Sequence, residues 1–115
     1  MARQNAEALI VVADPLFLQR QNQIVELAAK QRLPSIGAYG VYVEAGGLMS
    51  YGIDIREHIR RAATYVDKIF KGANPGDLPV EQPTTFELFI NLKTAKALGI
   101  KVPQSILIQA TKVIE

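Results

Sequence analysis

The sequence has no cysteine and only one histidine among its 115 residues. Without cysteine, disulfide bonds, thiolate catalysis, cysteine-ligated zinc and iron–sulfur clusters are excluded. A single histidine also argues against a histidine-rich metal site. We therefore expect neither a metal nor a cofactor.

Long hydrophobic runs are missing too. No apolar run approaches the roughly 20 residues that cross a bilayer, so we expect no membrane insertion. The N-terminus is polar and includes an acid, and the apolar run Ala8–Ala13 is too short for the core of a signal peptide. The sequence therefore predicts a protein that is not exported and stays in the cytoplasm.

The composition is that of one globular domain covering residues 1–115, with 49% apolar and 21% charged residues. Thirteen Lys and Arg face eleven Asp and Glu, which gives a net charge of +2. The basic residues are scattered along the chain, so we expect no nucleic-acid partner.

Four segments have the pattern of β-strands. Ala8–Ala13 is continuously apolar and rich in β-branched residues, which is typical of a strand covered on both faces. Residues 86–91 alternate with period two. The shorter candidates are Pro34–Tyr39 and Leu48–Tyr51, which Gly52 would end.

The clearest helix is Ile55–Phe70, with Asp54 as its cap and Gly72 at its end. Its apolar face, here called the apolar stripe, consists of Ile55, Ile59, Ala62, Ala63, Val66, Ile69 and Phe70. The other predicted helices run from about Leu16 or Arg20 to Gln31, over the single turn Val41–Ala45, over Leu92–Leu98 between Asn91 and Gly99, and from Pro103 to about Ile114. The segment Ala73–Gln82 is predicted to be a surface loop.

Strands and helices alternate in this order, which predicts an α/β fold with a mainly parallel sheet flanked by helices. Ligands of such folds sit at the carboxyl ends of the strands. This rule directs attention to Asp14, Tyr39 and Tyr51. Each also has a structural explanation. Asp14 before Pro15 is a good helix cap, which the residues alone favour, and tyrosine rings suit a half-buried core as well as a ligand.

No residue pattern indicates catalysis. The segment Glu44–Gly47 matches neither of the glycine-rich phosphate-binding patterns, and it is better explained as a helix end that turns into a strand. His58 lies on a charged helix with no serine or cysteine placed to form a triad. Asp14 with Glu44 is the one pair of acids that could be nominated for an enzyme.

Several stretches together resemble a known family. They are Ala8–Asp14, Ile24–Ala28, Leu33–Ile36, Val43–Gly52, Tyr65–Gly72, Asp77–Pro83 and Phe86–Gly99. In this order they are similar to the C-terminal part of ABC-transporter substrate-binding proteins of the tryptophan/tyrosine type. The resemblance implies a type 1 periplasmic-binding-protein fold, in which two α/β lobes clamp a small ligand, often an aromatic amino acid. It also implies a permease partner, a periplasmic location for the full-length protein, no catalysis and no cofactor.

The resemblance places Asp14 and Tyr51 near the cleft between the lobes, and Glu44 and Gly46 near its rim. Asp14 would pair with the ammonium group of an amino acid, and Tyr51 would pack on the ligand. Relative to the family, the first lobe and half of the second are missing from this truncated chain. The helix Ile55–Phe70 would then lack the lobe that covers its stripe, so we expect a homodimer through this helix, with or without segment exchange.

Two functions remain open at this point. One is the component of an ABC importer that binds a small molecule such as an amino acid, or a truncated part of that component. The other is a stand-alone oligomeric interaction or structural protein derived from that family, without a transport role. A small enzyme built on Asp14 and Glu44 is a third, which we do not expect.

Overall fold

Five strands form one sheet in the computed structural model, which describes residues 5–115. In spatial and chain order they are β1 (Leu9–Val11), β2 (Ser35–Gly37), β3 (Met49–Ile53), β4 (Phe86–Asn91) and β5 (Lys112–Ile114). The strands β1, β2 and β3 are parallel, β4 runs antiparallel to β3, and β5 is parallel to β4. The predicted α/β class with a mainly parallel sheet is confirmed.

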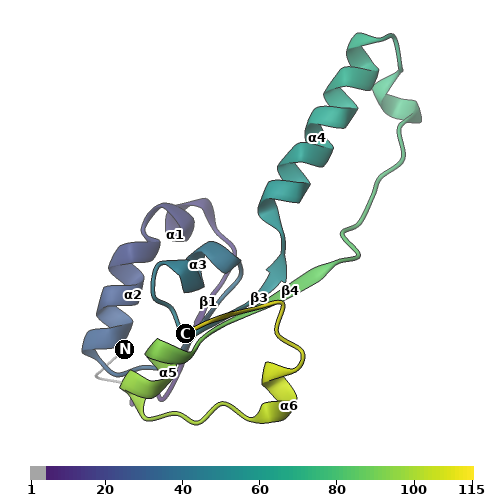
Figure 1. The fold of residues 1–115 in the computed structure, drawn as a ribbon. Coiled ribbons are helices and arrows are strands. Elements are labelled where there is room, and N and C mark those ends of the chain that lie inside the picture. The colour runs from purple at the N-terminus through teal and green to yellow at the C-terminus, as the bar shows by residue number, and fades with distance from the viewer. Residues whose placement is uncertain (1–4) are drawn as a thin grey trace.

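The helices fall into three groups, which Figure 1 shows. The connections between the first three strands contain α1 (Pro15–Gln19), α2 (Gln21–Lys30) and α3 (Gly40–Glu44). The excursion between β3 and β4 contains α4 (Ile55–Phe70) and a 3-10 turn (Pro75–Asp77). The connection from β4 to β5 contains α5 (Leu92–Leu98) and α6 (Gln104–Leu107).

The helix ends follow the predicted capping residues. Asp14, Asp54 and Asn91 each accept a backbone N–H from the first turn of the following helix, at 2.8, 2.9 and 3.1 Å. Gly99 ends α5 with φ of 74°, a conformation that glycine adopts without steric cost. The helix predicted between Leu16 or Arg20 and Gln31 is divided into α1 and α2 at Arg20.

The end of the chain differs from the prediction. A helix from Pro103 to about Ile114 was expected, but α6 ends at Leu107 and the last residues form β5. Val113 and Ile114 are β-branched, and Val113 pairs with Ile90 of β4. Sheet pairing with a distant strand outweighs the local helical pattern here.

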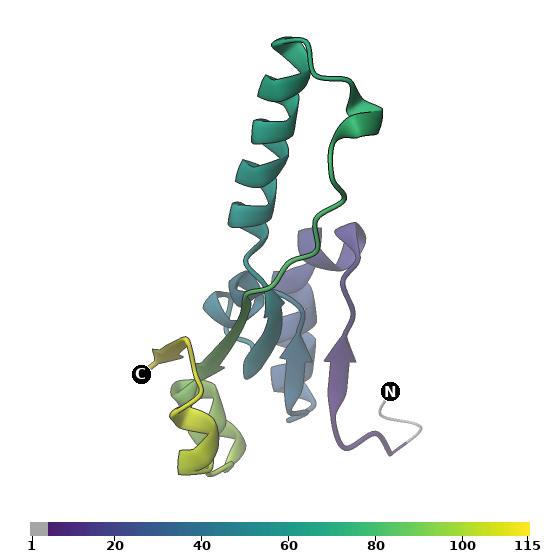
Figure 2. The same ribbon diagram turned by 90° about the vertical axis from the view of Figure 1, so that its right-hand side faces the viewer.

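The prediction that the first strand is covered on both faces is wrong. β1 is an edge strand, and the side chains of Ile10 and Val12 are 75% and 61% exposed. The helices α1 to α3 lie together behind the first three strands in Figure 2, and the face toward the viewer carries no helix there. The three parallel strands advance in one direction, so right-handed connections place their helices on one face only.

The core on the helix-covered face is centred on Tyr42 of α3. Its ring is buried, and its hydroxyl donates a hydrogen bond to Ser35 Oγ at 2.8 Å. Burial raises the pKa of the Tyr42 phenol, and the hydrogen bond to Ser35 offsets part of the rise. A Cβ atom at Gly37 would lie 2.6 Å from the Tyr42 ring, and one at Gly47 would also collide with it. Glycine at both positions lets the ring lie directly on the backbone.

The helix α4 projects away from the sheet and makes the molecule long (Figure 1). The radius of gyration is 17.5 Å, against about 13 Å for a compact domain of this length. The apolar stripe of this helix is from here on called the α4 stripe, and two of its members, Ile59 and Phe70, are 66% and 85% exposed. Among the residues that the structure describes, none covers these large side chains of the stripe.

The chain returns from the tip of α4 along one side of the helix. Arg61 forms an ion pair with Glu81, and the Tyr65 hydroxyl donates to the Pro79 carbonyl oxygen at 2.7 Å. Between helix and return segment runs an open groove of about 1010 Å³. The hydrogen bond and charge of Arg61 lower the pKa of the Glu81 carboxyl below its ordinary value. We call α4 and the return segment 71–85 the arm.

The close contact of Gly37 with Tyr42 predicts a stability difference. Gly37→Ala should lower the free energy of unfolding by about 1–3 kcal/mol, because the new methyl group collides with the ring. Gly76→Ala is the matched control, since its Cβ would meet only Asn74 at 3.6 Å, and should change stability by about 0.5 kcal/mol or less. Urea unfolding measures both, and equal losses would contradict the assignment of the core.

The arm should also respond to acid. Because the pKa of Glu81 is lowered in the folded chain, its ion pair is complete above the ordinary carboxyl pKa. It is lost as the pH falls through the lowered value. We expect amide NMR signals of residues 78–85 to shift together in that acidic range, and Glu81→Gln to show the shifted positions already at pH 7. Glu57→Gln, which removes an ion pair within α4 alone, should leave these signals in place.

Candidate functional site

The carboxyl ends of β1, β2 and β3 meet at one edge of the sheet, because the three strands are parallel. Asp14 follows β1 by three residues, and Tyr39 follows β2 by two. Tyr51 lies within β3, two residues before its end. This edge is where α/β folds bind ligands, so it is the candidate site.

A shallow hollow lies at this edge, on the side of the helices. It encloses about 20 Å³, which is room for about one water molecule. It is lined by Val11, Val12, Asp14, Phe17, Leu18, Gln21, Gly37, Ala38, Tyr39, Val41 and Tyr42. Pockets that bury a small ligand enclose roughly 300–1,000 Å³. The hollow can therefore hold one polar end of a ligand, and the remainder needs a second surface.

Asp14 caps a helix and also lies at the hollow. Its Oδ1 atom accepts the Leu16 N–H at 2.8 Å, so it caps α1, and its side chain also lines the hollow. A carboxylate has two oxygens and can accept several hydrogen bonds at once. Capping therefore leaves Asp14 able to accept a charge-assisted hydrogen bond from a ligand ammonium group.

Gln21 also lines the hollow, and the sequence analysis did not single it out. Its Oε1 atom is buried, and no residue within 5–115 donates a hydrogen bond to it. A buried acceptor without a donor costs about 1–3 kcal/mol, and Gln21 lines the same hollow as Asp14. Two side chains that can accept a ligand N–H therefore line the same hollow. Gln21 stands in a polar run of the sequence, and no local signal distinguishes it from its neighbours.

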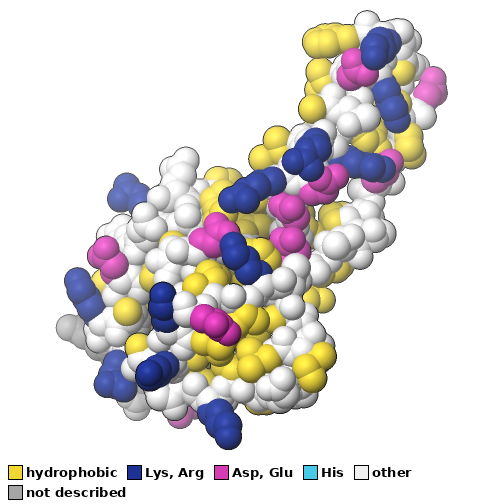
Figure 3. Space-filling view, viewed as in Figure 1, with side chains coloured by type: hydrophobic (Ala, Val, Ile, Leu, Met, Phe, Trp, Pro, Cys, Tyr) yellow, Lys and Arg dark blue, Asp and Glu magenta, His cyan; other side chains and the backbone are white. Residues whose placement is uncertain are grey.

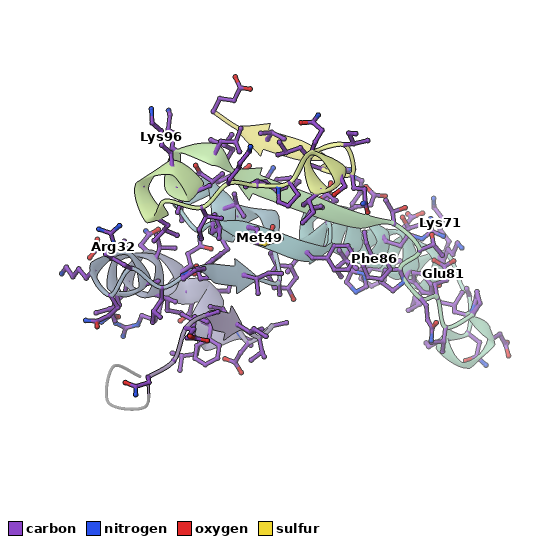
Figure 4. The ribbon with its side chains drawn as sticks, turned by 90° about the horizontal axis from the view of Figure 1, so that it is seen from below. Arg32, Met49, Lys71, Glu81, Phe86 and Lys96 are labelled. Carbon is purple, nitrogen blue, oxygen red and sulfur yellow. The ribbon has the colours of Figure 1, made fainter. Side chains whose placement is uncertain are left out.

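Tyr51 lies at the same edge but on the other face of the sheet. Its neighbour Ser50 is buried on the helix side, so the alternation of the strand turns Tyr51 away from the hollow, which it does not line. The Tyr51 ring stacks on Phe86, with centroids 5.7 Å apart and planes at 18°. Figure 4 shows Phe86 where the arm joins the sheet and Glu81 farther out along the arm. Phe86 was predicted only as part of an alternating strand.

Glu44 and Gly46 are not brought to the hollow. The Glu44 carboxylate lies 3.0 Å from Lys112 Nζ and 3.8 Å from Arg56 Nη2, so it joins β5 to the first turn of α4. The Gly46 carbonyl oxygen accepts a hydrogen bond from Thr94 Oγ1 of α5 at 2.9 Å. Because α5 follows the carboxyl end of the antiparallel strand β4, Gly46 lies at the opposite edge of the sheet from Asp14.

The other chemistry considered from the sequence finds no cluster here. His58 is exposed on α4, and Asp14 and Glu44 do not share the hollow. Within residues 5–115, no three acidic or histidine side chains are grouped so as to hold a metal ion. The helices of the same range include none with the length and apolar character needed to cross a membrane.

Comparison of sequences identifies a family and a relative. A sequence model of the family described as ABC transporter substrate binding protein matches residues 1–114. An uncharacterized protein of Rickettsia prowazekii is 29% identical over 93 residues. That match covers 81% of this chain and 31% of the Rickettsia protein.

Solved structures give closer likenesses in shape. A conserved domain protein from Vibrio cholerae superposes with a TM-score of 0.89 and 29% identity, covering 96% of this chain and 37% of that one. An ABC domain from Streptococcus, solved in complex with L-Trp, has a TM-score of 0.89 and 30% identity, with 98% and 38% covered. A ligand-free, open substrate-binding protein with adhesive properties from Clostridium difficile has a TM-score of 0.60 and 25% identity, with 93% and 36% covered.

The chain spans less than two-fifths of each of these relatives. The family match, in contrast, extends over nearly all of its residues, and both structures with the higher TM-score agree with the fold described above. On this evidence the chain belongs to the ABC transporter substrate-binding protein family.

Proposed function

We propose that the chain supplies one face of an amino-acid binding site in the receptor of an ABC importer, with the permease as its membrane partner. The observation that carries this proposal is the pair of acceptors, Asp14 and Gln21, that line one hollow at the carboxyl edge of the parallel strands. An ammonium group offers the positive charge that Asp14 favours and enough N–H donors for both side chains. The relative solved with L-Trp supports an amino acid as the ligand class.

The small volume of the hollow fits a two-surface clamp. Only the ammonium end of the ligand enters it, while the side chain of the ligand lies over the edge of the sheet between this lobe and a second surface. The Tyr51 and Phe86 rings offer an aromatic face at that edge, reached from the other side of the sheet. In this role the protein binds and delivers its ligand, works in the periplasm as the family does, and performs no catalytic step.

A matched pair of substitutions tests the ammonium contact. Asp14→Asn keeps a good helix cap but removes the charge, and we expect it to weaken L-Trp binding about tenfold or more. Asp54→Asn makes the same change at the cap of α4, far from the hollow, and should leave binding unchanged. NMR titration, which detects weak binding, measures both with L-Trp and L-Leu. Equal affinities for the two variants would contradict the proposal.

A second candidate function is that of an oligomeric interaction or structural protein, and the uncovered α4 stripe favours it. Ile59, Val66 and Phe70 expose large apolar side chains to solvent. Burying each of them would contribute about 1.5–3 kcal/mol, which together is comparable with the stability of a small domain. A second copy of the chain can provide this cover, as a homodimer through Ile55–Phe70.

Sedimentation equilibrium at micromolar concentration tests this candidate, with a dimer as the expected result. Ile59→Asp should shift the chain toward monomer, because it places a charge in the stripe. Asp14→Asn should not change the mass, since Asp14 lies outside the arm. A wild-type monomer would contradict the oligomeric candidate and leave the ligand test unaffected.

A further inference from the structure

Apart from Ile69, the members of the α4 stripe have a spacing that is the same in both directions along the helix. Six of its members, Ile55, Ile59, Ala62, Ala63, Val66 and Phe70, are separated by four, three, one, three and four residues. The smallest side chains stand at the centre of this pattern, and the largest one stands at an end. Two helix faces with this spacing can pack against each other in antiparallel orientation, with apolar side chains opposite apolar side chains.

We propose that two copies of this chain associate through antiparallel α4 helices that cross at Ala62 and Ala63. The two alanines allow the helix backbones to approach closely at the crossing. In this register Ile59 lies opposite Val66 of the partner subunit, and Ile55 lies opposite Phe70 of the partner subunit. The arrangement is a two-fold interface, with the same surface used by both copies. The proposal rests on the oligomeric candidate function and adds its geometry.

The charges beside the stripe fit the same register. Arg56, Arg60 and Asp67 fall on one edge of the stripe, within about 40° of one another around a helix of 3.6 residues per turn. In an antiparallel pair with two-fold symmetry, this edge adjoins the same edge of the partner. Asp67 of the partner subunit then lies between Arg56 and Arg60, and the symmetric contact forms as well. A parallel pair would place Asp67 two to three turns from both arginines.

The existing contacts leave these groups available. Asp67 pairs with Lys71 and Arg60 pairs with Glu57 on the exposed surface of the arm. Arg56 lies 3.8 Å from the Glu44 carboxylate, and its own side chain is 72% exposed. Exposed pairs of this kind contribute little and exchange partners easily. Ala62 and Ile69 lie at one margin of the stripe and also line the open groove beside the return segment. Ile59, Val66 and Phe70 do not line it, so most of the stripe lies clear of that segment. Hydrophobic side chains along one margin of the arm are open to view in Figure 3.

The absence of cysteine makes the register directly measurable, since each introduced thiol reports on one position. Under mild oxidation, we expect Ala62→Cys to form a disulfide-linked dimer. Ile55→Cys alone should not cross-link, but a mixture of Ile55→Cys and Phe70→Cys should give a heterodimer. Cross-linking of Ile55→Cys with itself would overturn the antiparallel register. A monomer by sedimentation would overturn both this inference and the oligomeric candidate.

Charge reversal gives an independent readout. We expect Asp67→Arg to raise the dissociation constant of the dimer about tenfold or more, because it faces two arginines of the partner. Glu57→Arg changes the charge equally on the far side of the helix and should have a much smaller effect. Mixing Asp67→Arg with the double variant Arg56→Asp, Arg60→Asp should restore association as a heterodimer. Equal effects of Asp67→Arg and Glu57→Arg, or no recovery on mixing, would contradict the charge contact.

Discussion

One-sided cover of the sheet is the constraint on which the rest of the structure depends. The connections through α1, α2 and α3 pack on a single face of β1 to β3, and they bury Tyr42 there against glycine backbone. The opposite face keeps Ile10 and Val12 exposed. The arm adds a second uncovered apolar surface. Burial of these two apolar surfaces by another lobe or another chain would add to the free energy of unfolding.

Local features of the fold could be predicted from the sequence, and distant contacts could not. Caps such as Asp54 and Asn91 act within one helical turn, so a short stretch of sequence contains the whole cause. β5 depends instead on pairing with β4, and the exposure of Ile10 depends on where other elements lie. The same division holds at the site. The location of Asp14 at the site could be predicted because it comes directly after a strand. The locations of Gln21 and Phe86 depend on packing between segments far apart in the chain.

The two proposed roles make competing use of the α4 stripe. A second lobe that completes a ligand clamp and a second copy that completes a dimer would each bury Ile59, Val66 and Phe70. The hollow at Asp14 belongs to the body of the lobe, and the stripe belongs to the arm, so either partner could act without altering the other surface. The partner that covers the stripe therefore decides the role of the chain. A second lobe would bring a ligand-holding surface to the edge of the sheet at Asp14, and a second copy would not need to.

The arm enters and leaves the sheet at neighbouring positions. Ile53 and Phe86 are register partners in the antiparallel pair of β3 and β4, so the 32 residues between them form an insertion between two adjacent points. A tight hairpin turn could join these ends without loss of a ladder hydrogen bond within the sheet. The pairing of β3 with β4 therefore does not depend on the length of the connection between them, and a shorter arm would leave the register of the sheet unchanged.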